Sequence, residues 1–138
     1  MRLFWLGLLI LWCIAIFYFT EQPVFNDEHT LRFISLLGVP EAIIKITDFI
    51  ARKLAHVTLF FITAYVALKV VRHWRWQYLA AWAFATFYGM TDEWHQLYVP
   101  GRSGKMGDVM IDSTGALLCI AIIYVWDKIH QKSNVVKQ

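Results

Sequence analysis

Long apolar runs alternate with short polar segments along this chain. The first run, residues 3–19, contains no charged side chain. As an α-helix it reaches roughly 26 Å, close to the thickness of a bilayer's hydrocarbon core. Three further runs, at about 54–71, 78–96 and 109–126, carry isolated polar residues in otherwise apolar sequence. The pattern predicts an all-α, polytopic membrane protein with a four-helix transmembrane bundle, because a helix makes its own backbone hydrogen bonds in lipid.

Two segments need separate interpretation. The first run could be a cleaved signal peptide, but aromatic residues occupy 17–19, where a cleavage site would have small residues. We therefore predict a retained helix. Further on, Pro40 followed by Glu41 is typical of a helix start. Apolar residues recur at helical spacing over 41–53, which predicts an amphipathic interfacial helix before the second span.

Composition agrees with a membrane protein. The chain is 59% hydrophobic and 17% charged, whereas soluble domains are about half apolar and about a quarter charged. Cys13 and Cys119 each lie within an apolar run, so we interpret them as small buried hydrophobic residues and expect no disulfide. The net charge of +3 comes from basic residues scattered near helix ends. We expect no nucleic-acid partner.

The basic residues predict the orientation in the membrane. With both termini cytoplasmic, one group of basic residues falls in short cytoplasmic segments, where the positive-inside rule applies best. This group comprises Arg2, Lys69, Arg72, Arg75, Lys128, Lys132 and Lys137. The extracytoplasmic group is spread over longer segments and comprises Arg32, Lys45, Arg52, Lys53, Arg102 and Lys105. Every acidic residue except Asp127 is also placed outside.

This orientation brings polar stripes from three helices to the outer membrane surface. Residues three or four apart share a helix face. The stripes are Lys53 with His56, Asp92 with Gln96, and Asp108 with Asp112 followed by Gly115. Ionisable groups in lipid are costly unless they face a partner or water. We therefore expect one pocket, in which Lys53, His56 and Arg102 face Asp92, Glu93, Asp108 and Asp112.

Simpler interpretations of single residues remain open. Arg52 and Lys53 could extend toward lipid head groups. Asp108 could cap the fourth helix, Glu93 could be a solvated helix-end residue, and His95 could be interfacial without a role.

The segment after the third span has two interpretations. Pro100-Gly101 is a common turn pair, and Arg102 within it is placed to bind carboxylates or phosphates in a bidentate manner. Asp112 and His56 are harder to explain as surface residues, because each lies inside its helix.

At these residues the sequence resembles the VanZ-like family of bacterial membrane proteins. The matching elements, spread over about residues 48–125, are Lys53-x-x-His56, Asp92-Glu93-x-x-Gln96, Pro100-Gly101-Arg102 and Asp108-x-x-x-Asp112-x-x-Gly115. The resemblance implies a single VanZ-like transmembrane domain over 1–138, in the cytoplasmic membrane of a mainly Gram-positive type of bacterium. The family is named after a protein associated with low-level teicoplanin resistance. Many members carry Asn at the position of Asp112, which argues against a proton-transfer role there.

Three functions are compatible with these residues. In the first, an anionic or amphiphilic envelope ligand binds in the pocket; examples are a lipid phosphate, a lipid-linked cell-wall precursor or a lipoglycopeptide. In the second, the protein is an intramembrane hydrolase or transferase that acts on a lipid-linked substrate. In the third, the polar set only holds the helices together as buried ion pairs. The ligand-binding residues would be Lys53, His56, Asp92, Glu93, Gln96, Arg102, Asp108 and Asp112.

For the enzyme, His56 would be the general base and Asp92 or Glu93 would orient it. Arg102 would stabilise developing negative charge, and Asp112 is a further catalytic candidate. We predict no cofactor, although the carboxylates with His56 form a donor set better suited to Mg²⁺, Ca²⁺ or Mn²⁺ than to zinc. Membrane lipids are expected partners, and the oligomeric state stays open.

Overall fold

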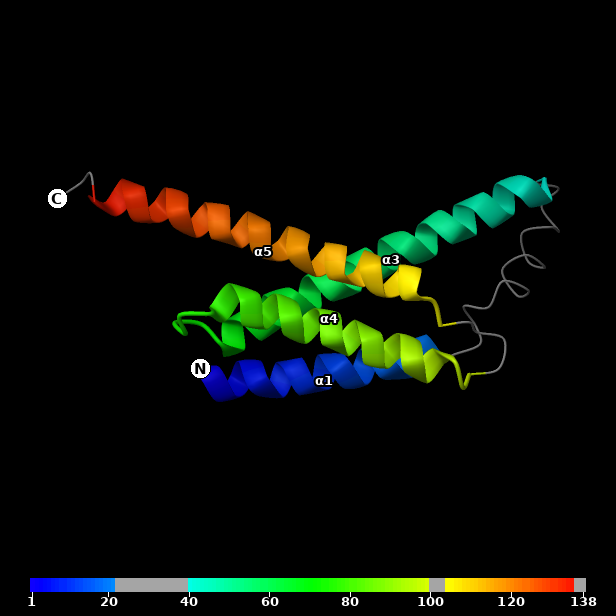
Figure 1. Cartoon of the computed structure of the whole chain (residues 1–138), viewed down its shortest axis with the longest axis horizontal. Helices are drawn as coiled ribbons and strands as arrows, with labels where there is room; N and C mark the ends of the chain where they lie inside the picture. Colours follow the sequence, from blue (N-terminus) through cyan, green and yellow to red (C-terminus); the bar gives the residue numbers. More distant parts are fainter. Residues whose placement is uncertain (22–39, 100–103, 136–138) are drawn as a thin grey trace.

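The computed structural model describes residues 1–21, 40–99 and 104–135 (Figure 1). Within these ranges the chain is helical and has no strand, which confirms the all-α prediction. The helices are α1 (Arg2–Glu21), α3 (Glu41–Val70), α4 (Gln77–Gln96) and α5 (Met106–Val135). Arg102 and the turn predicted at Pro100-Gly101 lie outside the described residues.

The predicted interfacial helix and the second span form one continuous helix, α3, of 30 residues. No glycine or proline interrupts it, so nothing in the sequence ends a helix near residue 53. The first half of α3 extends beyond the other helices (Figure 1). Its apolar side chains there, such as Ile46 and Phe49, are exposed. An interfacial position for 41–53 stays a prediction.

Three of the described helices are long and apolar enough to cross a membrane. The stretches are Arg2–Thr20 in α1, Lys45–Val70 in α3 and Met106–Gln131 in α5. The helix α4 does not meet this criterion, because its last turns carry Asp92, Glu93 and Gln96. Three of the four predicted spans thus have a matching helix, and the span at 78–96 stays a prediction.

The side chains are distributed as expected for a protein surrounded by lipid. Large apolar residues along α1, α3 and α5, such as Leu11, Leu54 and Ile122, are more than half exposed. The buried core is rich in small residues, including Ala64, Ala67, Ala81, Ala85 and Ala116. Small residues let membrane helices approach closely, and so much exposed apolar surface is rare on a soluble monomer. Together with the three spans, this indicates an integral membrane protein.

Close contacts between helices fix the bundle. Helices α3 and α5 cross (Figure 1), and a Cβ at Gly115 would lie only 2.5 Å from the Val57 backbone oxygen. Helix α1 is held on two sides. Nε1 of Trp12 donates to Oγ1 of Thr63 at 3.1 Å, and the Tyr88 hydroxyl donates to the Cys13 carbonyl at 2.6 Å.

The start of α1 and the end of α5 lie at the same end of the bundle (Figure 1). There, Arg72 donates to Oδ1 of Asp127 at 2.8 Å and the Tyr78 hydroxyl donates to Oδ2 at 2.6 Å. The hydrogen bond to Asp127 raises the pKa of Arg72. Lys69 lies over the ring of Trp5, 5.8 Å from its centroid. A basic and aromatic end of this kind agrees with the predicted cytoplasmic side, which stays a prediction.

Both cysteines are free, and Cys119 is buried while Cys13 is half-buried. This agrees with the prediction of small hydrophobic residues without a disulfide.

Candidate functional site

The opposite end of the bundle holds a ladder of polar contacts between α3 and α5. Nζ of Lys53 donates to Oδ1 of Asp108, and Nδ1 of His56 lies 2.9 Å from Oδ1 of Asp112. Both residues of each predicted stripe therefore face the other helix, as expected from their spacing. Gly115, the next residue of the same stripe, has no side chain, and this lets the backbones of α3 and α5 come into contact.

Asp108 does not cap α5. The helix begins at Met106, so Asp108 lies within the first turn, and its carboxylate pairs with Lys53 instead. The capping interpretation is therefore wrong. The carboxylate still lies where the helix dipole favours negative charge. Lys53 is 24% exposed in its side chain, so it is partly buried in this pair and not simply extended toward head groups.

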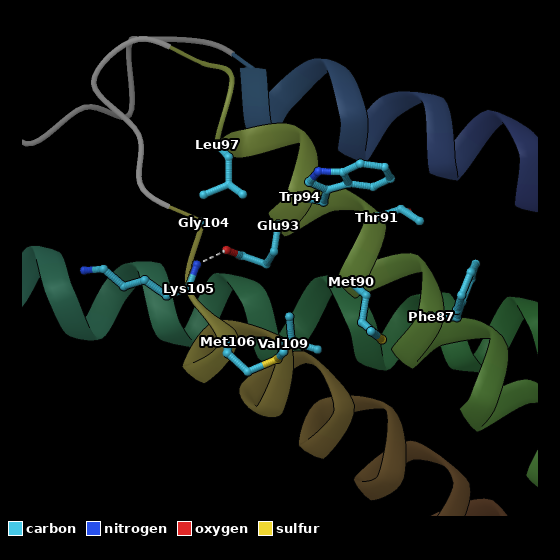
Figure 2. Close-up of a pocket in the computed structure, with 10 residues that line it drawn as sticks. All are labelled: Phe87, Met90, Thr91, Glu93, Trp94, Leu97, Gly104, Lys105, Met106 and Val109. Carbon is cyan, nitrogen blue, oxygen red and sulfur yellow. Dashed lines mark hydrogen bonds between the residues drawn. The ribbon is translucent and has the colours of Figure 1, made fainter.

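Glu93 joins the end of α4 to the start of α5. The residue is 4% exposed, and its Oε2 accepts the backbone N–H of Lys105 at 2.8 Å (Figure 2). The interpretation of Glu93 as a solvated helix-end residue is therefore wrong. A Cβ at Gly104 would lie 2.1 Å from the Glu93 carbonyl oxygen, so only glycine fits at that position.

Asp92 and Gln96 face a different neighbour from the one predicted. Oδ2 of Asp92 accepts Nε2 of Gln96, and Oδ1 accepts the hydroxyl of Thr20 on α1, both at 2.8 Å. All three residues are buried. Both carboxylate oxygens of Asp92 are thus bonded at the α1–α4 contact. The sequence did not identify Thr20; its one signal is a short hydroxyl side chain at the end of the first apolar run.

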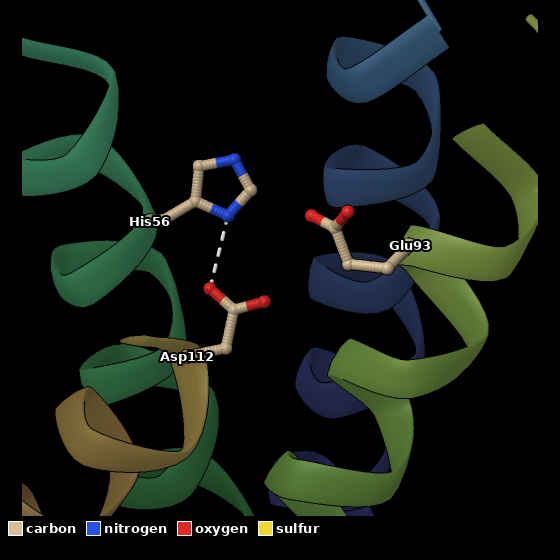
Figure 3. A group of neighbouring side chains, drawn as sticks. All are labelled: His56, Glu93 and Asp112. Atoms are coloured by element: carbon tan, nitrogen blue, oxygen red, sulfur yellow. Dashed lines mark hydrogen bonds and ion pairs between the residues drawn. The ribbon is translucent and has the colours of Figure 1, made fainter. Parts of the chain in front are cut away.

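Three side chains converge at the centre of this end. His56 from α3, Glu93 from α4 and Asp112 from α5 point toward one another (Figure 3). One possible ligand atom from each lies within 4.8 Å of the other two. Asp112, at 0% exposure, orients His56, whereas the sequence had assigned this role to Asp92 or Glu93. A Cβ at Gly89 would lie 3.2 Å from Oδ2 of Asp112, so this glycine, also not predicted, makes room for the carboxylate.

Two mainly apolar pockets flank the central cluster. One, of about 420 Å³, lies between α4 and the start of α5 (Figure 2). Its wall includes Met90, Trp94 and Val109, with the polar residues Glu93 and Lys105. The other, also about 420 Å³, is lined by residues of α1 and α3, including Phe19, Arg52 and His56. The first pocket borders Glu93 and Lys105, and the second borders Arg52 and His56.

Most of the predicted pocket is thus brought together within the described residues. Lys53, His56, Glu93, Asp108 and Asp112 share the region between α3, α4 and α5, while Asp92 and Gln96 turn toward α1. Arg102 lies outside the described ranges. The chemistry available is a His–Asp pair and two further carboxylates, beside apolar space of a size suited to lipid chains.

The model of the VanZ/LLP1 family matches residues 5–127. The match extends beyond the motifs at about 48–125 and takes in most of α1. No curated protein and no solved structure matches the chain.

Proposed function

Because the chain belongs to the VanZ/LLP1 family, we propose that it is a bacterial cell-envelope protein that binds an anionic amphiphile at the polar end of its bundle. The observation that carries the proposal is the apolar pocket between α4 and α5, whose wall includes Glu93 and Lys105. Binding sites for small molecules are mostly apolar and hold a few polar groups that fix orientation. This pocket has that character, and it offers room for part of a lipid chain.

The cationic groups at this end supply donors for an anionic head group. Lys105 is exposed at the pocket wall, and Lys53 and His56 lie nearby on α3. Arg102 precedes α5 in the sequence, and we propose that it adds a bidentate contact to the same head group. The carboxylates hold Lys53 and His56 in place through the contacts with Asp108 and Asp112.

We further propose that this end is extracytoplasmic, that both termini are cytoplasmic and that α4 is the fourth span. The support is the density of basic residues at the opposite end, including Lys69 and Arg72. An outward pocket would meet lipid phosphates and lipid-linked cell-wall precursors. Binding of such a ligand would link the protein to low-level tolerance of teicoplanin, as the family resemblance implies.

The test measures lipid binding to the purified protein by native mass spectrometry. The probes are phosphatidic acid, polyprenyl phosphate and a diacylglycerol with matched chains. We expect both phosphates to bind and the neutral lipid to bind at least about tenfold more weakly, a difference of about 1.4 kcal/mol. The two phosphates distinguish a membrane phospholipid from a wall-precursor carrier.

A pocket-filling variant provides the matched control. Met90 lines the pocket, so Met90→Trp fills it and lowers phosphate-lipid binding. Leu118 on α5 is similarly exposed, at 49% against 44% for Met90, but does not line this pocket, so Leu118→Trp leaves binding unchanged. Equal binding by the two variants, or no preference for phosphate, would contradict the proposal.

One observation favours an enzyme as the second candidate. Asp112 holds Nδ1 of His56, and His56 lines the pocket between α1 and α3, so its other ring nitrogen is available for proton transfer near neutral pH. A lipid-phosphate hydrolase would release phosphate from these probes. Turnover would be lost in His56→Asn and kept in His95→Asn. Absence of turnover by the unmodified protein would remove this candidate.

A further inference from the structure

Two buried carboxylate oxygens have no hydrogen-bond partner in the part of the chain that is described. They are Oε1 of Glu93 and Oδ2 of Asp112, and the residues are 4% and 0% exposed. A buried oxygen of this kind loses its hydration, and a hydrogen bond or a cation must offset that loss. Both carboxylates and the His56 ring converge on the same region between α3, α4 and α5 (Figure 3).

The distances suit one small divalent cation. One atom each from His56, Glu93 and Asp112 lies within 4.8 Å of the others. Around an octahedral ion with bonds of about 2.1 Å, adjacent ligands are about 3.0 Å apart and opposite ligands about 4.2 Å apart. The longest of the three separations, at most 4.8 Å, exceeds the distance between opposite ligands by roughly half an ångström.

The net charge of the three side chains also favours a bound divalent cation. With both carboxylates ionised, the three groups sum to one negative charge even when the imidazole is protonated. A divalent cation bound to two carboxylates and a neutral imidazole brings the sum to zero. It also gives each partnerless oxygen a bond, in a region where an unbalanced charge is costly.

The neighbouring acids are already satisfied and are not part of the donor set. Both oxygens of Asp92 accept hydrogen bonds from Thr20 and Gln96, and Asp108 pairs with Lys53. The partnerless oxygens therefore distinguish Glu93 and Asp112 from the other carboxylates at this end.

The donor types indicate the class of ion. Two carboxylate oxygens favour Mg²⁺ or Mn²⁺, and one imidazole nitrogen is better tolerated by Mn²⁺. Gly89 presents no side chain beside Oδ2 of Asp112, where an added Cβ would lie 3.2 Å from that oxygen and from the Phe60 ring.

We infer that His56, Glu93 and Asp112 bind one small divalent cation of the Mn²⁺ and Mg²⁺ class. The site goes beyond amphiphile binding and does not depend on it, because the three side chains supply the ligands themselves. A failed lipid-binding test would therefore leave this inference standing.

The test titrates Mn²⁺ into chelator-treated protein in nanodiscs and follows free Mn²⁺ by electron paramagnetic resonance. We expect one saturable site per chain, with Mg²⁺ competing for it. Glu93→Gln and Asp112→Asn each keep the size of the side chain, and each weakens Mn²⁺ binding by at least about tenfold, since even residues that only orient metal ligands are worth that much. Asp127→Asn makes the same chemical change at the other end of α5 and leaves Mn²⁺ affinity unchanged.

Thermal unfolding keeps the test decisive if a variant is poorly folded. Mn²⁺ raises the Tm of the unmodified protein and of Asp127→Asn but not of Glu93→Gln. Failure of the unmodified protein to show a saturable Mn²⁺ site overturns the inference. So does equal Mn²⁺ affinity in folded Glu93→Gln and Asp127→Asn.

Discussion

The contact between α3 and α5 leads to the sharpest structural prediction. In Gly115→Ala, the new Cβ would lie 2.5 Å from the Val57 carbonyl oxygen and 3.0 Å from its Cα. Ordinary contacts begin near 3.4 Å, so the helices must separate by about 0.9 Å. Because the obstructing atoms belong to the backbone, no side-chain rotation relieves the clash.

The magnitude follows from two opposing effects. Overpacking of a tight contact costs typically about 1–3 kcal/mol, and we take the upper end because backbone must move. Alanine in place of glycine within a helix returns about 1 kcal/mol. The net loss is therefore about 2 kcal/mol. Gly107 on the same helix has open space around it, so Gly107→Ala carries only the favourable effect of up to about 1 kcal/mol.

The two variants are compared by thermal unfolding in detergent with a thiol-reactive fluorophore. The buried Cys119 and half-buried Cys13 react as the bundle opens. A difference of about 3 kcal/mol corresponds to Tm values about 10 °C apart for a chain of this size. A Tm for Gly115→Ala equal to or above that of Gly107→Ala would refute the close approach of α3 and α5.

Two further predictions follow from single contacts, and a third follows from the head-group contact proposed for Arg102. Thr20→Val removes the hydroxyl bonded to buried Asp92 and destabilises the bundle by about 1–3 kcal/mol in the same unfolding assay. Thr20→Ser keeps a hydroxyl and restores the stability, whereas no loss of stability in Thr20→Val would show that the bond is unimportant. The partly exposed pair of Arg72 and Asp127 shows a coupling below about 1 kcal/mol in a double-mutant cycle; a larger value would contradict its treatment as a surface ion pair. Arg102→Ala abolishes teicoplanin tolerance in cells that express the protein, while membrane insertion, monitored by fractionation and immunoblotting, is unchanged. Wild-type tolerance in this variant would count against the proposed head-group contact.

The sequence predicted the polar stripes because helical spacing alone decides which residues share a face. Lys53 with His56 and Asp108 with Asp112 were assigned to common faces, and the structure joins the two stripes to each other. The cost of unpaired charges in lipid supplied the reason to expect that they meet.

The sequence could not decide how α4 is rotated. Asp92 and Glu93 are adjacent, so their side chains point about 100° apart around the helix axis. Only one of them can face α3 and α5. The choice depends on Thr20 of α1, which accommodates Asp92 and Gln96 and leaves Glu93 to face the other helices. A partner so distant in sequence leaves no periodic signal.

The two proposals fit together electrostatically. The central cluster of His56, Glu93 and Asp112 is acidic, and an acidic site alone would repel an anionic head group. A divalent cation held there would neutralise the carboxylates and take His56 as a neutral ligand, so Lys105 at the pocket wall would be left to attract the phosphate. The structural function of the polar set is then confined to Lys53 with Asp108 and to Asp92 with its partners.

The account depends most on the claim that an anionic amphiphile occupies the pocket between α4 and α5. The direct measurement places a photo-crosslinking amino acid at one of two positions. Thr91 lines the pocket, and Leu118 is exposed on α5 outside it. The adducts formed in living cells are then identified by mass spectrometry. The account predicts adducts at Thr91 that are enriched in phosphate-bearing lipids, and bulk membrane lipids at Leu118. The same lipid composition at both positions would contradict it.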